Sequence, residues 1–266
     1  MKSTLHFQIV KLMKQIPNLF TLLNLVFGCI AIVFILQTGE TIVLLQPEGF
    51  TEVNLPEKIT WGAFFIFAAA AVDFLDGFIA RLFKSTSNMG EQLDSLADVV
   101  SFGVAPGLIL YQLLRISYAQ QENGLEVSIA WLLPAFLIPC AAAWRLAKFN
   151  LDTEQQNSFK GVPTPAVGLV IASFPLIIHF QTLNLQFAFI NKWFLYIIIL
   201  LLSYLMVSNL SLINMKLKDL SVKNNLARYI LVIIGIIAVI SLKWLAVPAI
   251  FIAYVIISLS FKNKIT

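Results

Sequence analysis

Charged side chains are scarce in this sequence. Asp, Glu, Lys and Arg make up 12% of its 266 residues, whereas apolar side chains make up 59%. A soluble domain usually has about 25% charged residues. Together with a mean hydropathy of +0.87, this composition excludes an ordinary soluble protein and predicts an all-α, polytopic membrane bundle.

Cysteine and histidine are also rare. Cys29 and Cys140 lie inside apolar runs, and His6 and His179 are isolated from each other in the sequence. Neither residue type therefore forms a disulfide framework or a spacing of metal ligands. Linkers, internal repeats and low-complexity tracts are lacking as well, so the sequence predicts one membrane domain over residues 1–266.

Long apolar runs are abundant. A membrane-spanning helix needs about 17–25 mostly apolar residues. We expect about eight transmembrane helices, at residues 17–37, 59–83, 95–114, 128–149, 165–183, 193–213, 228–242 and 244–261. The last two should form a tight hairpin, because one long helix would leave Lys243 in the hydrocarbon.

The sequence divides this domain into three parts. Residues 1–16 carry apolar side chains near one helical face, which predicts a short interfacial helix. Residues 17–213 are predicted to form a six-helix bundle, and residues 228–261 are predicted to form a C-terminal helical hairpin. Residues 38–58, between the first two spans, are expected to be a solvated loop.

The basic residues predict the orientation in the membrane. If the N-terminus is cytoplasmic, 14 of the 18 Lys and Arg residues fall in inner segments, and only Lys58, Arg115, Lys192 and Lys243 fall in outer ones. Cytoplasmic segments carry an excess of Lys and Arg. Both termini should therefore face the cytoplasm, in a cell inner membrane.

Four aspartates interrupt the apolar pattern where the second span ends and the third begins. Asp73 and Asp76 are three residues apart, and Asp94 and Asp98 are four apart, so each pair shares a helical face. Both pairs are predicted to lie near the cytoplasmic surface and to face each other. Four carboxylates this close repel unless cations lie among them. Oxygen ligands alone favour Mg²⁺, Mn²⁺ or Ca²⁺.

Small and basic residues accompany the aspartates. Gly77 leaves the backbone beside Asp76 uncovered, and Ala80 has only a methyl group on the next turn of the same face. The planar guanidinium of Arg81 is suited to binding phosphate. Ser87 and Gly90 follow in the connecting loop. The site is therefore predicted to hold a bulky phosphate-containing molecule, such as a nucleotide, together with metal ions.

The whole pattern, D-x2-D-G-x2-A-R-x8-G-x3-D-x3-D, resembles the signature of the CDP-alcohol phosphatidyltransferases. All its fixed positions match, and they are Asp73, Asp76, Gly77, Ala80, Arg81, Gly90, Asp94 and Asp98. The resemblance implies transfer of a phosphatidyl group from CDP-diacylglycerol to an alcohol, with release of CMP.

The resemblance also implies roles for individual residues. The four aspartates would bind two divalent ions, Mg²⁺ or Mn²⁺, and Asp98 would also be the catalytic base. The CDP part of the lipid would be held by Gly77, Ala80, Arg81 and Ser87. The family places a PNxxT stretch near the cytidine, which here gives Asn18 and Thr21. These two residues could instead serve only to begin the helix after Pro17.

Four other stretches resemble the integral-membrane phosphatidylserine synthases of this family. They are PNLFTLLNLVFG at 17–28, DSLADVVSFGVAPG at 94–107, RLAKFN at 145–150 and FKGVPTPA at 159–166. This resemblance implies L-serine as the acceptor. The family is often dimeric, which implies a homodimer. A nucleic-acid partner is not expected.

Serine is a zwitterion, so its site should offer a cation to its carboxylate. Residues 145–160 supply Arg145, Lys148, Asn150 and Lys160, and Ser101 lies one turn after Asp98. The basic residues could instead be cytoplasmic anchors, and Ser101 could serve helix packing.

Two alternatives remain at this stage. The same chemistry could use another acceptor, such as glycerol 3-phosphate or inositol phosphate. The chain could instead transport divalent cations, since carboxylates inside membranes are common in transporters. Against transport, the aspartates lie toward one end of their spans, and transporter sites usually lie near the bilayer midplane between repeats.

Overall fold

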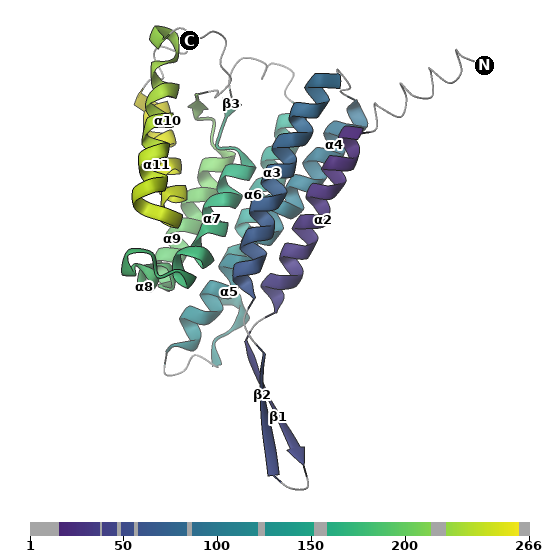
Figure 1. The fold of residues 1–266 in the computed structure, drawn as a ribbon, viewed down its shortest axis with the longest axis vertical. Helices are drawn as coiled ribbons and strands as arrows, with labels where there is room; N and C mark the ends of the chain where they lie inside the picture. The colour runs from purple at the N-terminus through teal and green to yellow at the C-terminus, as the bar shows by residue number, and fades with distance from the viewer. Residues whose placement is uncertain are drawn as a thin grey trace, which may run out of the picture.

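The computed structural model describes residues 16–37, 39–46, 49–55, 58–83, 87–121, 126–151, 159–213 and 222–260. In this part of the chain the architecture is a bundle of long helices with two small β ladders (Figure 1). The interfacial helix predicted for residues 1–16 lies outside the described residues, apart from Ile16.

The first two predicted spans are present as α2 (Ile16–Leu36) and α3 (Ile59–Phe83), which pack side by side. The prediction for α3 is confirmed at both ends. The segment between them was predicted as a loop, and that prediction is wrong. Strands β1 (Glu40–Gln46) and β2 (Gly49–Leu55) pair antiparallel and project from one end of the bundle (Figure 1). Alternation of apolar and polar residues in GFTEVNL is typical of a strand.

The third predicted span, 95–114, is longer than expected. It consists of α4 (Asn88–Asp98), the π-helix η1 (Val99–Val104) and α5 (Ala105–Ala119) in continuous succession. The Ala105 N–H donates to Val100 O, five residues back. Pro106 follows and has no N–H to continue the ordinary helical ladder, which favours a local change of hydrogen-bond register.

The middle helices largely follow the predicted spans. The segment predicted at 128–149 consists of η3 (Ile129–Trp131), η4 (Leu133–Phe136) and α6 (Leu137–Leu151). Helix α7 (Thr164–His179) corresponds to the span predicted at 165–183. The short elements η5 (Thr182–Asn184) and α8 (Gln186–Phe189) then lead to α9 (Lys192–Val207).

The predicted end of the sixth span, at 213, is wrong. Helix α9 ends at Val207, and strand β4 (Ser211–Leu212) pairs antiparallel with β3 (Phe159–Lys160). The Val162 N–H donates to Leu205 O at 3.1 Å, so the chain before α7 satisfies a carbonyl at the end of α9. The helix ends where the apolar run is interrupted by Ser208 and Asn209, and this non-local contact fixes the chain beyond that end.

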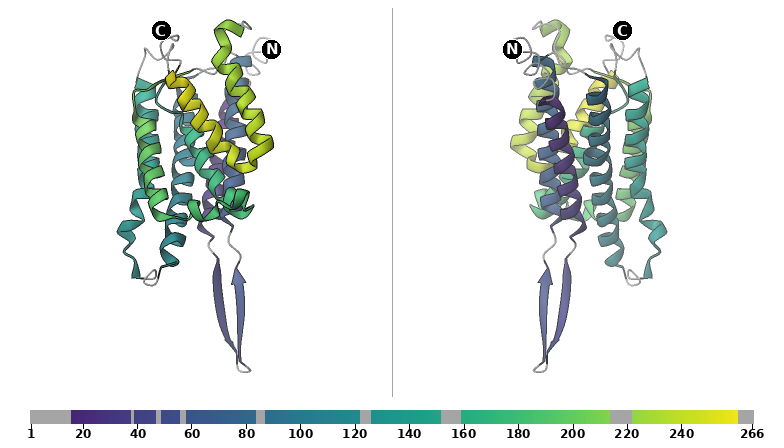
Figure 2. Two further views of the ribbon diagram at one scale, coloured as in Figure 1. Left: turned by 90° about the vertical axis from the view of Figure 1, so that its left-hand side faces the viewer. Right: turned by 90° about the vertical axis from the view of Figure 1, so that its right-hand side faces the viewer.

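The C-terminal helices form the predicted hairpin. Helix α10 (Val222–Leu242) and helix α11 (Ala246–Ser260) pack against each other, and η6 (Lys243–Leu245) joins them. Lys243 has φ +50°, which turns the chain. Trp244 packs edge-on against Phe64 and Phe67 of α3, so the hairpin is fixed to the bundle by aromatic contacts. Figure 2 shows both helices along one side of the molecule.

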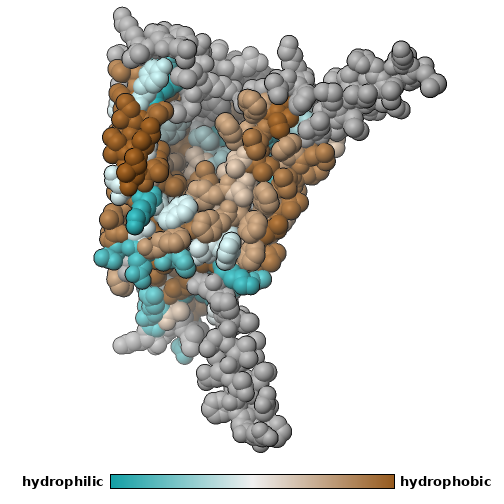
Figure 3. All heavy atoms as spheres, in the orientation of Figure 1, coloured by the Kyte–Doolittle hydropathy of each residue, from teal (hydrophilic) through white to brown (hydrophobic). Residues whose placement is uncertain are grey.

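The outer surface of the bundle is apolar. Side chains such as Val33, Phe74, Leu200 and Ile240 are exposed, and apolar residues cover the height of the helices (Figure 3). Within the described ranges, four helical stretches are long and apolar enough to cross a membrane, at Pro17–Leu36, Ile59–Ile79, Asn88–Ala119 and Asn225–Ser260. The last includes the α10–α11 turn. Shorter apolar helices cover Thr164–His179 and Lys192–Val207. The chain is therefore a helical integral membrane protein.

Candidate active site

The two predicted aspartate pairs lie together. Asp73 and Asp76 project from the last turns of α3, and Asp94 projects from α4. One carboxylate oxygen from each of these three residues lies within 4.8 Å of the others. Asp98 is outside this set, but it is close enough to Asp73 and Asp94 to interact with them electrostatically. The structure thus brings all four carboxylates to one end of the bundle.

Helix α2 supports this cluster from behind. The Thr21 hydroxyl donates to Asp76 Oδ2 at 2.7 Å, and the Asn24 amide donates to Asp98 Oδ1 at 3.4 Å. Both α2 side chains are buried. Asn24 is a functional candidate that the sequence prediction missed. Its signal was present in PNLFTLLN, because Asn24 lies three residues after Thr21 and therefore on the same helical face.

The donor atoms fit a hard divalent cation. Asp94 Oδ1 and Asn24 Oδ1 are buried, and neither has a hydrogen-bond partner among the described residues. Buried polar atoms of this kind normally require a partner. Three converging carboxylates also repel each other unless positive charge lies between them. Oxygen-only donors of this number are typical of Mg²⁺ or Mn²⁺ sites.

Among the described residues, Gly77 of the predicted CDP site faces open space. A Cβ placed on Gly77 would have no described atom within 4 Å, other than its own helix backbone and chain neighbours. Ser87 is the N-cap of α4, and its Oγ accepts from the Gly90 N–H at 3.0 Å. Gly90 was predicted to lie in the connecting loop, and that prediction is wrong, because Gly90 lies in the first turn of α4. A Cβ on Gly90 would lie 3.0 Å from Asn18 Oδ1, so the start of α2 reaches this turn. The side chains of Ala80 and Arg81 lie outside the described part.

Helix α6 closes the other side of the cluster. Arg145 is 9% exposed, and its Nη1 donates to Thr164 Oγ1 at 3.2 Å. Its buried Nε has no hydrogen-bond partner in the described residues. Asp98 is close enough to interact with this guanidinium electrostatically. Arg145 is thus a fixed, incompletely satisfied cation beside the carboxylates.

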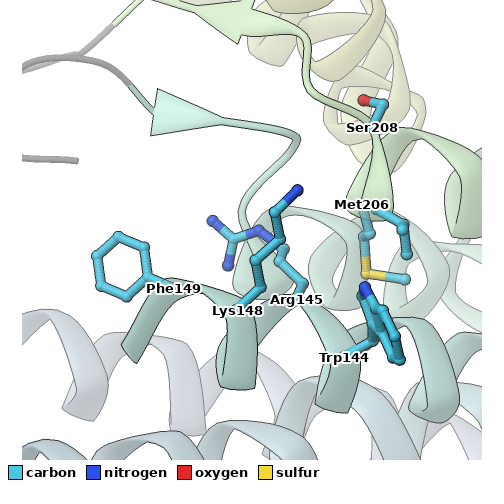
Figure 4. A pocket seen from close by; sticks show the side chains of 7 residues that line it. Trp144, Arg145, Lys148, Phe149, Met206 and Ser208 are labelled. Carbon is cyan, nitrogen blue, oxygen red and sulfur yellow. The ribbon is translucent and has the colours of Figure 1, made fainter. Parts of the chain in front are cut away.

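A pocket opens next to this arginine. Arg145 and Lys148 line it from α6, and Met206 and Ser208 line it from the end of α9 (Figure 4). Lys148 Nζ donates to Asn209 Oδ1 at 2.7 Å, so this cation is held near the pocket. Two cations at a pocket of this kind suit a small anionic group such as a carboxylate.

The remaining acceptor-site candidates have structural partners. The Ser101 hydroxyl donates to Asn24 O at 3.0 Å, and a Cβ on Gly28 would lie 2.3 Å from Ser101 Oγ. Ser101 therefore packs closely against α2. The Asn150 amide donates to Ser95 Oγ at 3.0 Å and joins the end of α6 to α4. The side chain of Lys160 lies outside the described residues.

Comparison with known proteins identifies the family. The model of the CDP-alcohol phosphatidyltransferase family matches residues 14–206. A Helicobacter pylori protein (strain ATCC 700392 / 26695) is 37% identical over 174 residues, which cover 64% of this chain and 65% of that protein. A Bacillus subtilis protein (strain 168) is 30% identical over 185 residues, covering 68% and 89%.

A Mycobacterium bovis protein is 29% identical over 251 residues, covering 90% of this chain and 75% of that protein. All three relatives carry the name CDP-diacylglycerol–serine O-phosphatidyltransferase. The chain spans just under two thirds of the length of the Helicobacter relative. The family model covers well over half of the chain, and the match includes the carboxylate cluster. This chain therefore belongs to the CDP-alcohol phosphatidyltransferase family, as its signature predicted.

Proposed function

We propose that this protein transfers a phosphatidyl group from CDP-diacylglycerol to the hydroxyl of L-serine, giving phosphatidylserine and CMP. The observation that carries the proposal is the convergence of Asp73, Asp76 and Asp94, with Asp98 beside them, inside a matched family signature. The names of the relatives support serine as the acceptor. The buried cation Arg145 supports it independently, since serine carries a carboxylate.

The four aspartates would hold two divalent ions, Mg²⁺ or Mn²⁺. When bound, the ions would neutralise the pyrophosphate and stabilise charge on the departing CMP. The protein contributes the placement of the carboxylates. The Thr21 hydroxyl fixes one oxygen of Asp76, and such supporting hydrogen bonds hold ligands in position for a metal.

The CDP part of the donor lipid would lie along the last turns of α3. The open space at Gly77 admits a large group close to the backbone. We assign the phosphates and cytidine to Gly77, Ala80, Arg81 and Ser87, with Asn18 and Thr21 at the start of α2. Arg81 would supply a fixed positive charge to the same phosphates.

Asp98 is assigned as the base. The serine hydroxyl oxygen attacks the phosphorus that carries diacylglycerol, and its proton passes to Asp98 as the new P–O bond forms. The bond from this phosphorus to CMP breaks, and CMP leaves with the electron pair. Asn24 donates to Asp98 Oδ1, which fixes the carboxylate and favours one orientation toward the acceptor.

The acceptor would bind between the carboxylates and α6. Arg145 would bind the serine carboxylate, because its Nε is buried without a partner among the described residues. The predicted contributors Ser101, Asn150 and Lys160 belong to the same proposal. Ser101 and Asn150 would act by holding α2, α4 and α6 together.

The membrane arrangement is also a proposal. We propose eight transmembrane helices in one domain: a catalytic six-helix bundle at 17–213 and a hairpin at 228–261. The start of α2 and the end of α11 lie at the same end of the bundle, opposite the β1–β2 hairpin (Figure 1). With the basic residues, this supports termini and active site facing the cytoplasm, in an inner membrane. A homodimer is expected from the family resemblance.

An acceptor panel tests the proposal. The purified chain is supplied with CDP-diacylglycerol, Mg²⁺ or Mn²⁺, and L-serine, glycerol 3-phosphate or inositol phosphate. We expect CMP release and a lipid of the mass of phosphatidylserine only with serine. A product with another acceptor would change the assigned substrate. Metal flux into vesicles without CMP release would indicate a cation transporter instead.

A further inference from the structure

The C-terminal hairpin lies beyond the stretch that the family model matches, yet it contacts the acceptor side of the site. Helix α11 carries two hydroxyl side chains one turn apart, Tyr254 and Ser258. The Tyr254 hydroxyl donates to Ile213 O at 3.1 Å, and the Ile213 N–H donates to Ser258 Oγ at 3.3 Å. Helix α11 therefore satisfies both backbone groups of Ile213.

These polar side chains are unusual for their position. Helix α11 is otherwise almost entirely apolar, and Ser258 is completely buried. Residues four apart in a helix lie on one face, so Tyr254 and Ser258 point at the same partner. Polar groups inside a membrane helix are costly unless they are paired, and they often mark functional positions.

Ile213 is the last residue of the segment after α9 that pairs with the chain leading into α7. It follows strand β4, which pairs with β3. The Gly161 N–H donates to Leu210 O at 2.9 Å, and Gly161 has φ +75°. A Cβ on Gly161 would lie only 2.5 Å from Met206 O, so the two segments are in close backbone contact.

The chain that leads into α7 also contacts Arg145, the arginine assigned to the acceptor site. Thr164 begins α7, three residues after Gly161, and accepts a hydrogen bond from Arg145. Tyr254 is also close enough to Arg145 to interact with it electrostatically. Helix α11 is therefore connected to the guanidinium by hydrogen bonds, from Ile213 through the β3–β4 ladder to the segment that leads into Thr164.

We propose that α11 completes the acceptor subsite, with Tyr254 and Ser258 as positioning residues that hold Ile213, Thr164 and Arg145 in place for an acceptor carboxylate. This inference rests on the proposed function. The ligand it concerns is a small amino acid with a free carboxylate and a hydroxyl. The donor lipid lies on the α3 and α4 side, and α11 should not affect its binding.

Removing single hydroxyls tests the inference in the full-length enzyme. We expect Tyr254→Phe and Ser258→Ala each to raise KM for L-serine by about 3- to 10-fold, since each removes one hydrogen bond. The KM for CDP-diacylglycerol should stay within about 2-fold of wild type, because a single distant hydroxyl is not part of its site. Tyr204→Phe is the matched control, because Tyr204 is 67% exposed on α9. It should change neither constant.

Two results would overturn the inference while the proposed function stands. One is an unchanged serine KM in both variants. The other is a parallel loss for both substrates, which would show a general structural role. If the wild type transfers to another acceptor, the proposed function fails, and the same variants are judged on the KM of that acceptor. Absence of any transfer by the wild type would overturn both proposals.

Discussion

Asn24 and Asp98 are 74 residues apart in the sequence, and the amide of one donates to the carboxylate of the other at 3.4 Å. Asn24 is fully buried and Asp98 is 7% exposed. A buried amide that contacts the assigned base connects α2 directly to the chemistry. Helix α2 therefore contributes Asn24 to the site, in addition to Asn18 and Thr21 at its start.

Replacing Asn24 with Ala should lower kcat by about 10- to 100-fold, because Asp98 loses the hydrogen bond that orients it. The KM for CDP-diacylglycerol should change little, since Asn24 is not among the residues assigned to the lipid. Steady-state kinetics of the purified variant measure both. Cys29→Ala, on the exposed side of the same helix, is the control. A wild-type kcat in Asn24→Ala would refute the orienting role.

Replacing Asp98 with Asn should abolish turnover, because the amide cannot accept the serine proton. Binding of CDP-diacylglycerol should largely survive, since Asp73, Asp76 and Asp94 keep their mutual geometry. Turnover and equilibrium binding of the donor lipid are measured separately. Glu91→Gln makes the same chemical change on an exposed turn of α4 and should remain active. Near-normal turnover in Asp98→Asn would defeat the base assignment.

Replacing Thr21 with Val should raise the Mg²⁺ or Mn²⁺ concentration needed for half-maximal activity by about 10-fold or more. The change removes the hydroxyl that donates to Asp76 Oδ2 and keeps nearly the same shape. A metal titration of activity gives the value. Thr60→Val, at the opposite end of α3, is the matched control. An identical metal requirement in both variants would contradict a supporting role for Thr21.

Replacing Gly77 with Ala should leave the protein at least as stable while it weakens binding of the donor lipid. The added methyl meets no described atom beyond its own helix and chain neighbours, so the helix should be unchanged or more stable by about 0.5–1 kcal/mol. The KM for CDP-diacylglycerol should nevertheless rise, because the methyl occupies space assigned to the CDP group. Gly235→Ala controls for the helix effect, since a Cβ there makes only an ordinary contact with Ile250.

The Gly77 prediction has two readouts, thermal unfolding and donor-lipid KM. Higher stability with a weakened KM is the expected combination. An unchanged donor-lipid KM would show that the space beside Gly77 is not used by the substrate.

The sequence predicted those features that depend on local composition. The apolar run that follows Lys58 predicted both ends of α3. The spacing of the aspartates predicted that each pair lies on one helical face. The family followed from the same residues. The break after Val207 was missed although Ser208 and Asn209 follow it directly, and the hydrogen bond from the Val162 N–H to Leu205 O at this end of α9 has no local signal. Hydropathy carries no information about such distant partners.

The polar contacts behind the site were equally hidden. The sequence places Asn24 on the same helical face as Thr21, but only the packed structure shows that Asn24 faces Asp98. Tyr254 and Ser258 lie in a run that hydropathy identifies only as a span. The π-helix at Val99–Val104 also depends on packing and on the register before Pro106. These features arise from tertiary contacts that single-sequence patterns do not encode.

The most direct test of the central claim is to locate the metal in crystals of the full-length protein grown with Mn²⁺ and CDP-diacylglycerol. We expect anomalous-difference peaks bonded to oxygens of Asp73, Asp76 and Asp94, with Asp98 beside them and the pyrophosphate on the same ions. Crystals of an active preparation that bind the lipid with no Mn²⁺ among these carboxylates would contradict it.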